Sequence, residues 1–291
     1  MTERLKIGGG ALLDGVMIRS ERFSAVVRCI EGDDPHYELT EEKTQELPGW
    51  LGVIARTPLL RGVCLPLLLA WQLKGRTLEG TKKPEPPLSM KIVALIMLAM
   101  VFVPFIWIAN SFFPPGLVRN FVALAPFFLL FGGGIIWMRK SVSGILKYHG
   151  AEHKAVWVYD DTGNPPDIET ARKRSRFHPR CGSCLIASWF ILLVVLSLAF
   201  PNLPMLWVLL IIGAVSAELT VIARYGFLGK VLNCAGLALQ RLTTIEPDDE
   251  HLRIAIASTK AVLALETTQN LPELPRTRTF KDFSELEEVI G

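Results

Sequence analysis

Hydrophobic and polar residues fall in long blocks along this chain. Two apolar stretches, 91–110 and 118–138, are followed by a polar segment and then by two more, 184–200 and 204–223. Each stretch is close to the about 20 residues that a helix needs to cross about 30 Å of hydrocarbon. The pattern therefore predicts a mainly α-helical integral membrane protein, with a four-helix transmembrane bundle made of two helical hairpins.

The residues before the first apolar stretch predict a different structure. Residues 1–50 contain an alternation of apolar positions, such as Phe23, Ala25 and Val27, and a turn signal in "GDDP". Such alternation is typical of a half-buried strand, so a small β-hairpin or sheet is expected here. Residues 59–73 are apolar but short and interrupted, which favours an interfacial or re-entrant helix.

Beyond the last apolar stretch, residues 228–242 and 250–265 have the spacing of amphipathic helices, and the chain after 266 is polar. The pattern predicts six regions in chain order: 1–90, a β-hairpin region with an interfacial helix and a linker; 91–138, a first transmembrane hairpin; 139–183, a cytoplasmic loop; 184–223, a second transmembrane hairpin; 224–265, amphipathic helices; and 266–291, a loosely ordered polar tail.

The distribution of basic residues predicts how the chain is oriented in the membrane. The loop 139–183 is rich in lysine and arginine, whereas the other connections between apolar stretches are short and nearly uncharged. Because basic residues collect on the cytoplasmic side of a membrane, this loop and both termini are expected in the cytoplasm. The net charge of +3 is too small to indicate nucleic-acid binding. The partner that the apolar stretches predict is the lipid bilayer.

Candidate chemistry lies at the start of that loop, in "YHGAEHKAV" at residues 148–156. His149 and His153 are four residues apart, which places both imidazoles on one face of a helix, within reach of a single zinc ion. Glu152, beside the second histidine, can then act on a metal-bound water. The order His-x-x-Glu-His is similar to the inverted zincin motif. The alternative is that these are exposed polar residues at a helix end.

A third ligand is needed, and "FHPRCGSC" offers His178 and Cys181 just before the third apolar stretch. Cys181 and Cys184 form a C-x-x-C pair, which indicates metal binding in a reducing compartment. The alternative is that both cysteines are small apolar residues at a helix start.

Glu218, inside the fourth apolar stretch, is the other candidate ligand. An ionised carboxylate is costly there unless it is hydrated, paired or bound to a metal. With two histidines it would complete a site that keeps room for water, as catalytic zinc sites do. The alternative is an ion pair with Arg224 or Lys147.

Six motifs in order, "GGGALLDGVMIRS", "RTPLLRG", "HGAEHKAV", "HPRCGSC", "AELTVIARYG" and "LQRLTTIEPDDEHLRIAI", resemble the YqhQ-like family of bacterial membrane proteins. This family has no assigned function and is commonly described as predicted metal-dependent enzymes. The resemblance implies a location in the bacterial inner membrane. The family's signature positions fall on Gly15, Arg19, Arg61, Gly62, His149, Glu152, His153, His178, Arg180, Cys181, Glu218, Gln240, Thr243, Thr244 and Glu246 of this chain. The family motif has no second cysteine where this chain has Cys184, which favours Cys181 as the sulfur ligand.

These features lead to a functional hypothesis: a zinc-dependent hydrolase with its site at the cytoplasmic membrane surface. Analogy with zincins suggests a peptide bond in a membrane protein as the substrate. Histidine and carboxylate ligands also suit iron, manganese or cobalt, so another divalent metal is the alternative to zinc. Glu152 would take a proton from the attacking water, and Arg180 or Arg19 would stabilise the developing oxyanion. The competing hypothesis is a non-catalytic membrane scaffold with a closed, structural metal site. A transporter that uses Glu218 is a weaker third alternative, because no second intramembrane charge accompanies it.

Overall fold

The computed structural model describes residues 5–32, 34–44, 46–65, 67–68, 104, 106–141, 143–222, 226–268 and 273–290. The chain divides into two compact units. The first contains Met1–Glu46, Trp137–Pro179 and Leu237–Gly291, and the second contains Leu47–Ile136 and Arg180–Gly236. Each unit therefore joins segments that are far apart in the sequence.

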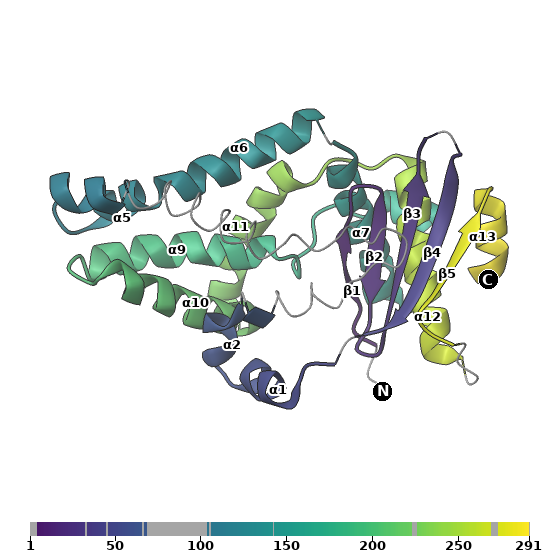
Figure 1. Ribbon diagram of the computed structural model, residues 1–291, viewed down its shortest axis with the longest axis horizontal. Coiled ribbons are helices and arrows are strands. Elements are labelled where there is room, and N and C mark those ends of the chain that lie inside the picture. Colours follow the sequence, from purple (N-terminus) through teal and green to yellow (C-terminus); the bar gives the residue numbers. More distant parts are fainter. Residues whose placement is uncertain are drawn as a thin grey trace, which may run out of the picture. The chain divides into compact units, whose positions relative to one another are not determined.

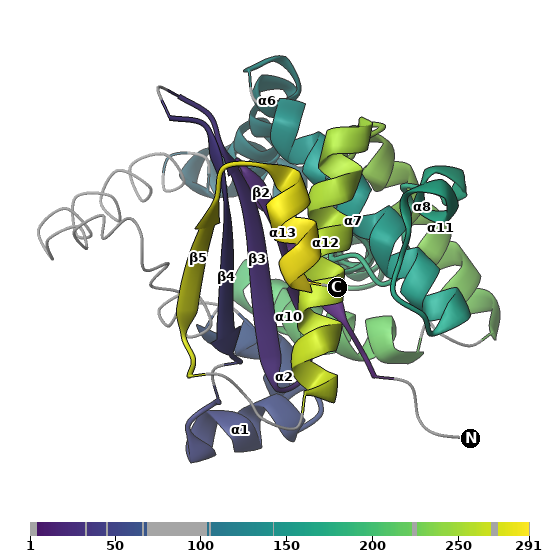
Figure 2. The ribbon, with the colours of Figure 1, turned by 90° about the vertical axis from the view of Figure 1, so that its right-hand side faces the viewer.

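A five-stranded antiparallel sheet forms one layer of the first unit (Figure 2). Its strands are β1 (Gly8–Ala11), β2 (Gly15–Arg19), β3 (Phe23–Ile30), β4 (His36–Lys43) and β5 (Arg276–Phe280), in that spatial order. The alternation seen in the sequence predicted a sheet in residues 1–50, and β1 to β4 confirm it. The fifth strand comes from the other end of the chain and pairs with β4.

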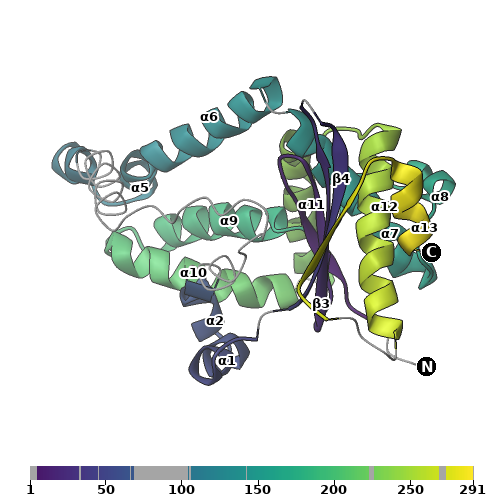
Figure 3. The same cartoon turned by 45° about the vertical axis from the view of Figure 1, so that its right-hand side comes forward.

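Helices cover one face of this sheet (Figure 3). They are α7 (Ser143–Thr162), α8 (Ile168–Lys173), α12 (Asp249–Thr267) and α13 (Phe283–Ile290). Helix α12 packs against β2 and β3, and α7 packs against β1, β2 and α12. Because successive strand residues point to opposite faces, Ala25 and Val27 enter one apolar core together with Ile254 of α12. This core removes the central strands from water.

A buried serine also ties α12 to the sheet. The Ser258 hydroxyl donates to the Val16 carbonyl at 2.8 Å and accepts from the Val27 amide at 3.2 Å. Buried backbone groups need such partners, because an unpaired one costs about as much as a lost hydrogen bond. The serine therefore fixes the position of the helix along the strands.

The predicted loosely ordered tail, 266–291, is wrong for its described C-terminal part. Arg276–Phe280 forms β5, and Leu286 of α13 is fully buried. Arg276 and Arg278 both bond the carboxylate of Glu41 on β4, which is itself almost fully buried. The segment "RTRTF" has little apolar content, so its pairing depends on these ion pairs and on the β4 edge rather than on a readable hydrophobic pattern.

The second unit is helical (Figure 1). Its helices are α1 (Gly49–Arg56), α2 (Leu60–Val63), α5 (Leu117–Ala123), α6 (Ala125–Ser141), α9 (Ser183–Ala199), α10 (Met205–Ile222) and α11 (Gly226–Thr243), of which α6 and α11 end in the first unit. Helices α9 and α10 lie side by side and bury Leu193, Leu196, Val208 and Ile212 between them and α5.

The prediction of a four-helix transmembrane bundle is wrong. Among the residues that the structure describes, no single helix has the length and apolar character that crossing a membrane requires. The predicted stretch 118–138 is divided at Leu124 into α5 and α6, which meet these requirements only as a pair bent by 57°. Helix α9 has 17 residues and so spans about 26 Å, against about 30 Å of hydrocarbon. Most of the first predicted stretch, 91–103, lies outside the described residues.

Candidate metal centre

The motif residues of α7 lie inside the first unit rather than on its surface. Glu152, His153 and Lys154 are 7%, 3% and 3% exposed. The alternative that these are exposed polar residues at a helix end is therefore wrong for them. Burying charged groups is costly unless they have partners, so the hydrogen bonds and ion pairs of these side chains indicate which chemical roles they can have.

Two glycines allow neighbouring backbone to come close to this turn. A Cβ atom added to Gly150 would lie 2.4 Å from the carbonyl oxygen of Ile245, and one added to Gly9 of β1 would lie 3.1 Å from Cγ of Glu152. Contacts under about 3.0 Å do not occur for real Cβ atoms, so no side chain fits at Gly150 without backbone movement. The segment that follows α11 is thus held directly against α7.

Hydrogen bonds to backbone carbonyls orient the two histidine rings. Nδ1 of His149 lies 2.9 Å from the carbonyl oxygen of Thr243, and Nδ1 of His153 lies 2.6 Å from that of Arg176. A carbonyl oxygen only accepts, so in each ring Nδ1 carries the proton and donates it. In a neutral imidazole this leaves the lone pair on Nε2, which is how second-shell carbonyls prepare histidines for a metal. The ring centroids are 4.5 Å apart.

Cys181 completes a candidate site. The ligand atoms of His149, His153 and Cys181 all lie within 4.8 Å of one another. Zinc–nitrogen and zinc–sulfur bonds of about 2.0 and 2.3 Å place tetrahedral ligand atoms about 3.3 to 3.6 Å apart, so small side-chain rotations would close the group around an ion. The described residues thus contain a candidate His-His-Cys metal site.

His178, three residues before Cys181, has a different role. Its amide donates to Oε1 of Gln240 at 2.7 Å, and its carbonyl accepts from Nε2 of the same residue at 2.8 Å. Its ring nitrogen Nε2 lies 3.2 Å from the carboxylate of Asp160. Since three residues of chain reach at most about 10 Å, this anchored histidine keeps Cys181 near α7. His178 itself is not a member of the His-His-Cys group.

Glu218 also lies outside the group, in a tight ion pair within the second unit. Its carboxylate accepts from Nε and Nη2 of Arg61, at 2.8 and 2.5 Å, and from the Leu59 amide at 2.9 Å. An ion pair was the alternative expected from the sequence, but with another partner. Lys147 instead pairs with Asp248 at 2.6 Å, and Arg224 lies outside the described residues.

The carboxyl of Glu152 is a weaker acid than that of an ordinary glutamate. Burial raises its pKa to about 7, against an opposing effect of His149. A group with this pKa both accepts and releases a proton near neutral pH, which suits a general acid–base. Next along the helix, Lys154 forms an ion pair with Glu246 at 2.5 Å and donates to the Arg172 carbonyl.

The remaining predicted residues flank the group. Arg180 is exposed and directly precedes Cys181. Cys184 is buried against α11, where a Cβ added to Gly236 would lie 2.4 Å from its sulfur. Burial also raises the pKa of the Cys184 thiol, which makes it a poor metal ligand. The His-His-Cys group contains Cys181 and does not contain Cys184.

Sequence reasoning missed two residues that hold the site together. Trp157 donates from Nε1 to the Phe177 carbonyl at 2.7 Å, and Asp160 holds the ring of His178. Both lie on α7 at helical spacing from His149 and His153, so the four residues share one face. That spacing was present in the sequence and could have identified them.

Comparisons with known proteins give a family but no activity. Residues 77–265 match the family described as "Protein of unknown function (DUF1385)". The chain is also 26% identical to the "Uncharacterized protein YqhQ" of Bacillus subtilis (strain 168) over 309 aligned positions, which cover 92% of this chain and 95% of that protein. No solved structure matches. The family match spans more than half of the chain, and the protein therefore belongs to this YqhQ-like family of unknown function.

Proposed function

We propose that this protein is a zinc-dependent hydrolase, with the ion held by His149, His153 and Cys181. The observation that carries the proposal is the pair of carbonyl-oriented imidazoles next to a cysteine sulfur, with all three ligand atoms within 4.8 Å of one another. Histidine nitrogen and cysteine thiolate are the ligands that zinc prefers.

Three protein ligands are the number found in catalytic zinc sites, where the fourth position is kept for water. Bound zinc supplies a Lewis acid that brings the pKa of water to about 7. The chain's own contribution is Glu152, whose raised pKa allows it to hold the proton that an attacking water loses. Arg180, which is exposed and directly precedes Cys181 in the chain, would stabilise negative charge on a carbonyl oxygen. Peptide bonds are the substrate class suggested by the His-x-x-Glu-His order.

One observation favours a second candidate, a structural metal site. Residues 176–178 are fastened to α7 by His153 and Trp157 through the carbonyls of Arg176 and Phe177. A metal shared between α7 and Cys181 would reinforce that attachment without any reaction. The two candidates differ in the fourth ligand, which is a water in a catalytic site and a protein group in a closed one.

The same proposal assigns the lipid bilayer as the partner of the second unit. Trp107, Phe112, Leu129, Trp207 and many other large apolar side chains of this unit are more than half exposed. Apolar surface of this extent is unusual in a protein surrounded by water and is typical of membrane or protein contact.

Metal analysis of the purified full chain tests the site. Wild-type protein should carry about one zinc per chain, and His149→Ala and Cys181→Ser should each lose most of it. His36→Ala is the matched control, because His36 lies on β4, outside the group, and should leave the zinc content unchanged. Equal zinc in all four proteins, or none in the wild type, would remove the basis of the proposal.

A second measurement separates catalysis from structure. Zinc is replaced by Co²⁺, whose visible absorption reports the ligands, and acetohydroxamate is added as a probe. A spectral change shows an open coordination position and supports the hydrolase, while an unchanged spectrum favours the structural site. Glu152→Gln should keep the metal and the Co²⁺ spectrum but lose peptide hydrolysis, since an amide cannot accept the proton from water.

A further inference from the structure

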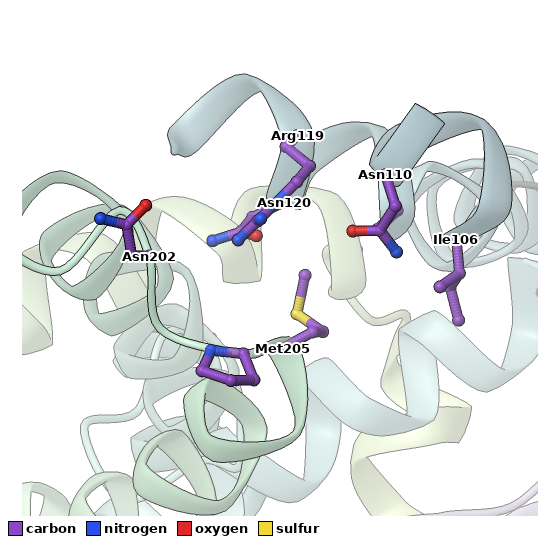
Figure 4. Close-up of a pocket in the computed structure, with 8 residues that line it drawn as sticks. Ile106, Asn110, Arg119, Asn120, Asn202 and Met205 are labelled. Carbon is purple, nitrogen blue, oxygen red and sulfur yellow. The ribbon is translucent and has the colours of Figure 1, made fainter. Parts of the chain in front are cut away.

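A polar cavity in the second unit has no role in the proposed reaction. Its volume is about 310 Å³, which lies within the size range of small-ligand sites. Figure 4 shows the amides of Asn110, Asn120 and Asn202 and the guanidinium of Arg119 around it. The apolar part of its lining is formed by Ile106, Ala123, Pro204 and Met205. Many exposed side chains of this unit are large and apolar, so a cavity lined by three asparagines and one arginine differs from its surroundings.

Asn120 is the strongest indication of a ligand. Its side chain is buried, at 1% exposure, and Nδ2 donates to Ser197 Oγ at 2.8 Å. The other half of its amide, Oδ1, has no hydrogen-bond partner among the described residues. If the amide were turned by 180°, the serine hydroxyl would donate instead and the NH₂ group would be the unsatisfied half. In either orientation a buried polar group at the cavity needs a partner.

Arg119 gives the cavity its charge. Of the eight lining residues it is the one that is ionised at neutral pH. Its Nη2 donates to the Pro201 carbonyl at 3.2 Å, which orients the guanidinium and leaves further N–H donors for a ligand. Asn110 and Asn202 are exposed and add amide donors at the rim. A single guanidinium with several amide donors fits a phosphate group better than a neutral ligand.

The surroundings of the cavity are apolar. Phe112, Phe200 and Leu206, which are neighbours in sequence of the lining residues, are 71%, 58% and 66% exposed. A ligand whose phosphate lies on Arg119 can therefore extend hydrocarbon over adjacent apolar surface. This combination matches a phospholipid headgroup with its acyl chains outside, although a soluble phosphate ester shares the headgroup chemistry.

We propose that this cavity binds the phosphate of a phosphate ester, with Arg119 and the amides of Asn110 and Asn202 holding its oxygens and Asn120 bonding the adjoining polar group. The site is independent of the metal centre. Its loss would leave the zinc content unchanged, so failure of one proposal is distinguishable from failure of the other.

The test is calorimetric titration of the detergent-solubilised full chain with three probes: dihexanoyl phosphatidylglycerol, glycerol 3-phosphate and inorganic phosphate. Saturable binding of the lipid alone supports the site with a lipid as its source. Comparable binding of glycerol 3-phosphate supports the site with a soluble ester as its source. Absence of saturable binding by all three overturns the proposal.

Variants connect the binding to the cavity. Arg119→Gln should weaken binding of the tightest probe by about ten- to a hundredfold, the usual effect of losing a charge-assisted hydrogen bond. Asn202→Ala, an exposed rim position, should weaken it less and is a safer test of folding than a change at Asn120. Arg56→Gln, an exposed arginine at the end of α1, is the control and should bind as the wild type does. Equal affinity of Arg119→Gln and wild type would overturn the proposal.

Discussion

The two units of this protein differ in where their apolar side chains lie. In the first unit the apolar side chains form one core between the sheet and its helices. Among its described residues the large apolar side chains left exposed are Leu13 and Val289, with Trp137 and Leu242 near its boundaries. Among the described residues of the second unit the buried cluster consists of Leu193, Leu196, Val208 and Ile212, and exposed large apolar side chains occur on α1, α5, α6, α9 and α10.

This difference is what the proposed contact between the second unit and a lipid bilayer would explain. A sheet covered by helices hides its apolar residues from water, which is the ordinary route to stability. Helices that turn leucine and tryptophan outward are stable only where those side chains meet another apolar medium or a partner. His149 and His153 of the proposed metal group belong to the unit with the enclosed apolar core, and the proposed phosphate site belongs to the unit with many exposed apolar side chains.

The largest expected effect comes from placing a charge on each kind of surface. Leu129 of α6 and Leu13 in the first unit are equally exposed, at 67% each. If lipid surrounds the second unit, Leu129→Lys should destabilise the protein by about 3 kcal/mol in lipid nanodiscs, the cost of a lysine at hydrocarbon depth. Leu13→Lys should change the free energy of unfolding by less than about 0.5 kcal/mol, as surface changes in water do.

Denaturant unfolding in nanodiscs measures both variants in one experiment. The comparison between units fails if the two lysines are tolerated equally. A loss of stability in Leu129→Lys that persists unchanged in detergent and in lipid of any thickness would indicate that another part of the chain, rather than a bilayer, covers this side chain.

Replacing one glycine in each unit by alanine should change stability by a smaller amount, and with opposite signs in the two units. Gly150 of α7 has the Ile245 carbonyl 2.4 Å from the position of a Cβ, whereas Gly133 of α6 has nothing within 4 Å. Gly133→Ala should stabilise its helix by about 1 kcal/mol through the better helix propensity of alanine. Gly150→Ala should destabilise the first unit by about 2 kcal/mol, because the clash with backbone exceeds that gain.

Thermal unfolding of the two variants beside the wild type gives both signs. Should Gly133→Ala destabilise the protein, another group covers that face of α6. If Gly150→Ala is neutral, the segment after α11 is not fixed against α7, and the support for His149 from the Thr243 carbonyl becomes doubtful.

The sequence predicted the helical and strand character of much of the chain, but not how its parts are assembled. Alternation in β3 and the apolar runs of α9 and α10 are local signals, and these elements are present. The break at Leu124 did have a local signal, because Pro126 follows two residues later and has no N–H to donate to the Val122 carbonyl, but the continuous apolar run hid it. The pairing of β5 with β4 joins residues more than 230 positions apart, and a polar strand at a sheet edge leaves no apolar pattern to read.

For the candidate site, local spacing was sufficient for His149, Glu152 and His153, since one helix sets their geometry. Sequence left His178, Cys181 and Glu218 as alternative ligands because the third ligand depends on tertiary contacts. The hydrogen bonds between the Gln240 side chain and the His178 backbone, and those from Arg61 to Glu218, join residues far apart in the sequence, so no periodicity reveals them.

The smallest expected effect concerns how helices begin in the two units. Asp167 caps α8 in the first unit, where its carboxylate accepts from the Thr170 amide at 2.9 Å. In the second unit, α1, α5 and α9 follow Pro48, Gly116 and Gly182, none of which provides a side-chain cap. Helix α12 of the first unit also begins without a side-chain cap, so the contrast concerns α8 alone. Asp167→Ala should therefore cost about 1 kcal/mol at pH 7, the usual value of such a cap.

The pH dependence of that loss identifies its cause. Hydrogen bonds from Thr170 hold the pKa of Asp167 below its ordinary value, so the cap stabilises the folded state above about pH 4 and its contribution disappears as the pH falls further. Unfolding curves of wild type and Asp167→Ala should thus converge in acid. Asp167→Asn keeps an oxygen acceptor that does not titrate, so it should be close to the wild type at pH 7 and more stable than it in acid. A constant difference between wild type and Asp167→Ala at every pH would instead assign the effect to packing of the side chain.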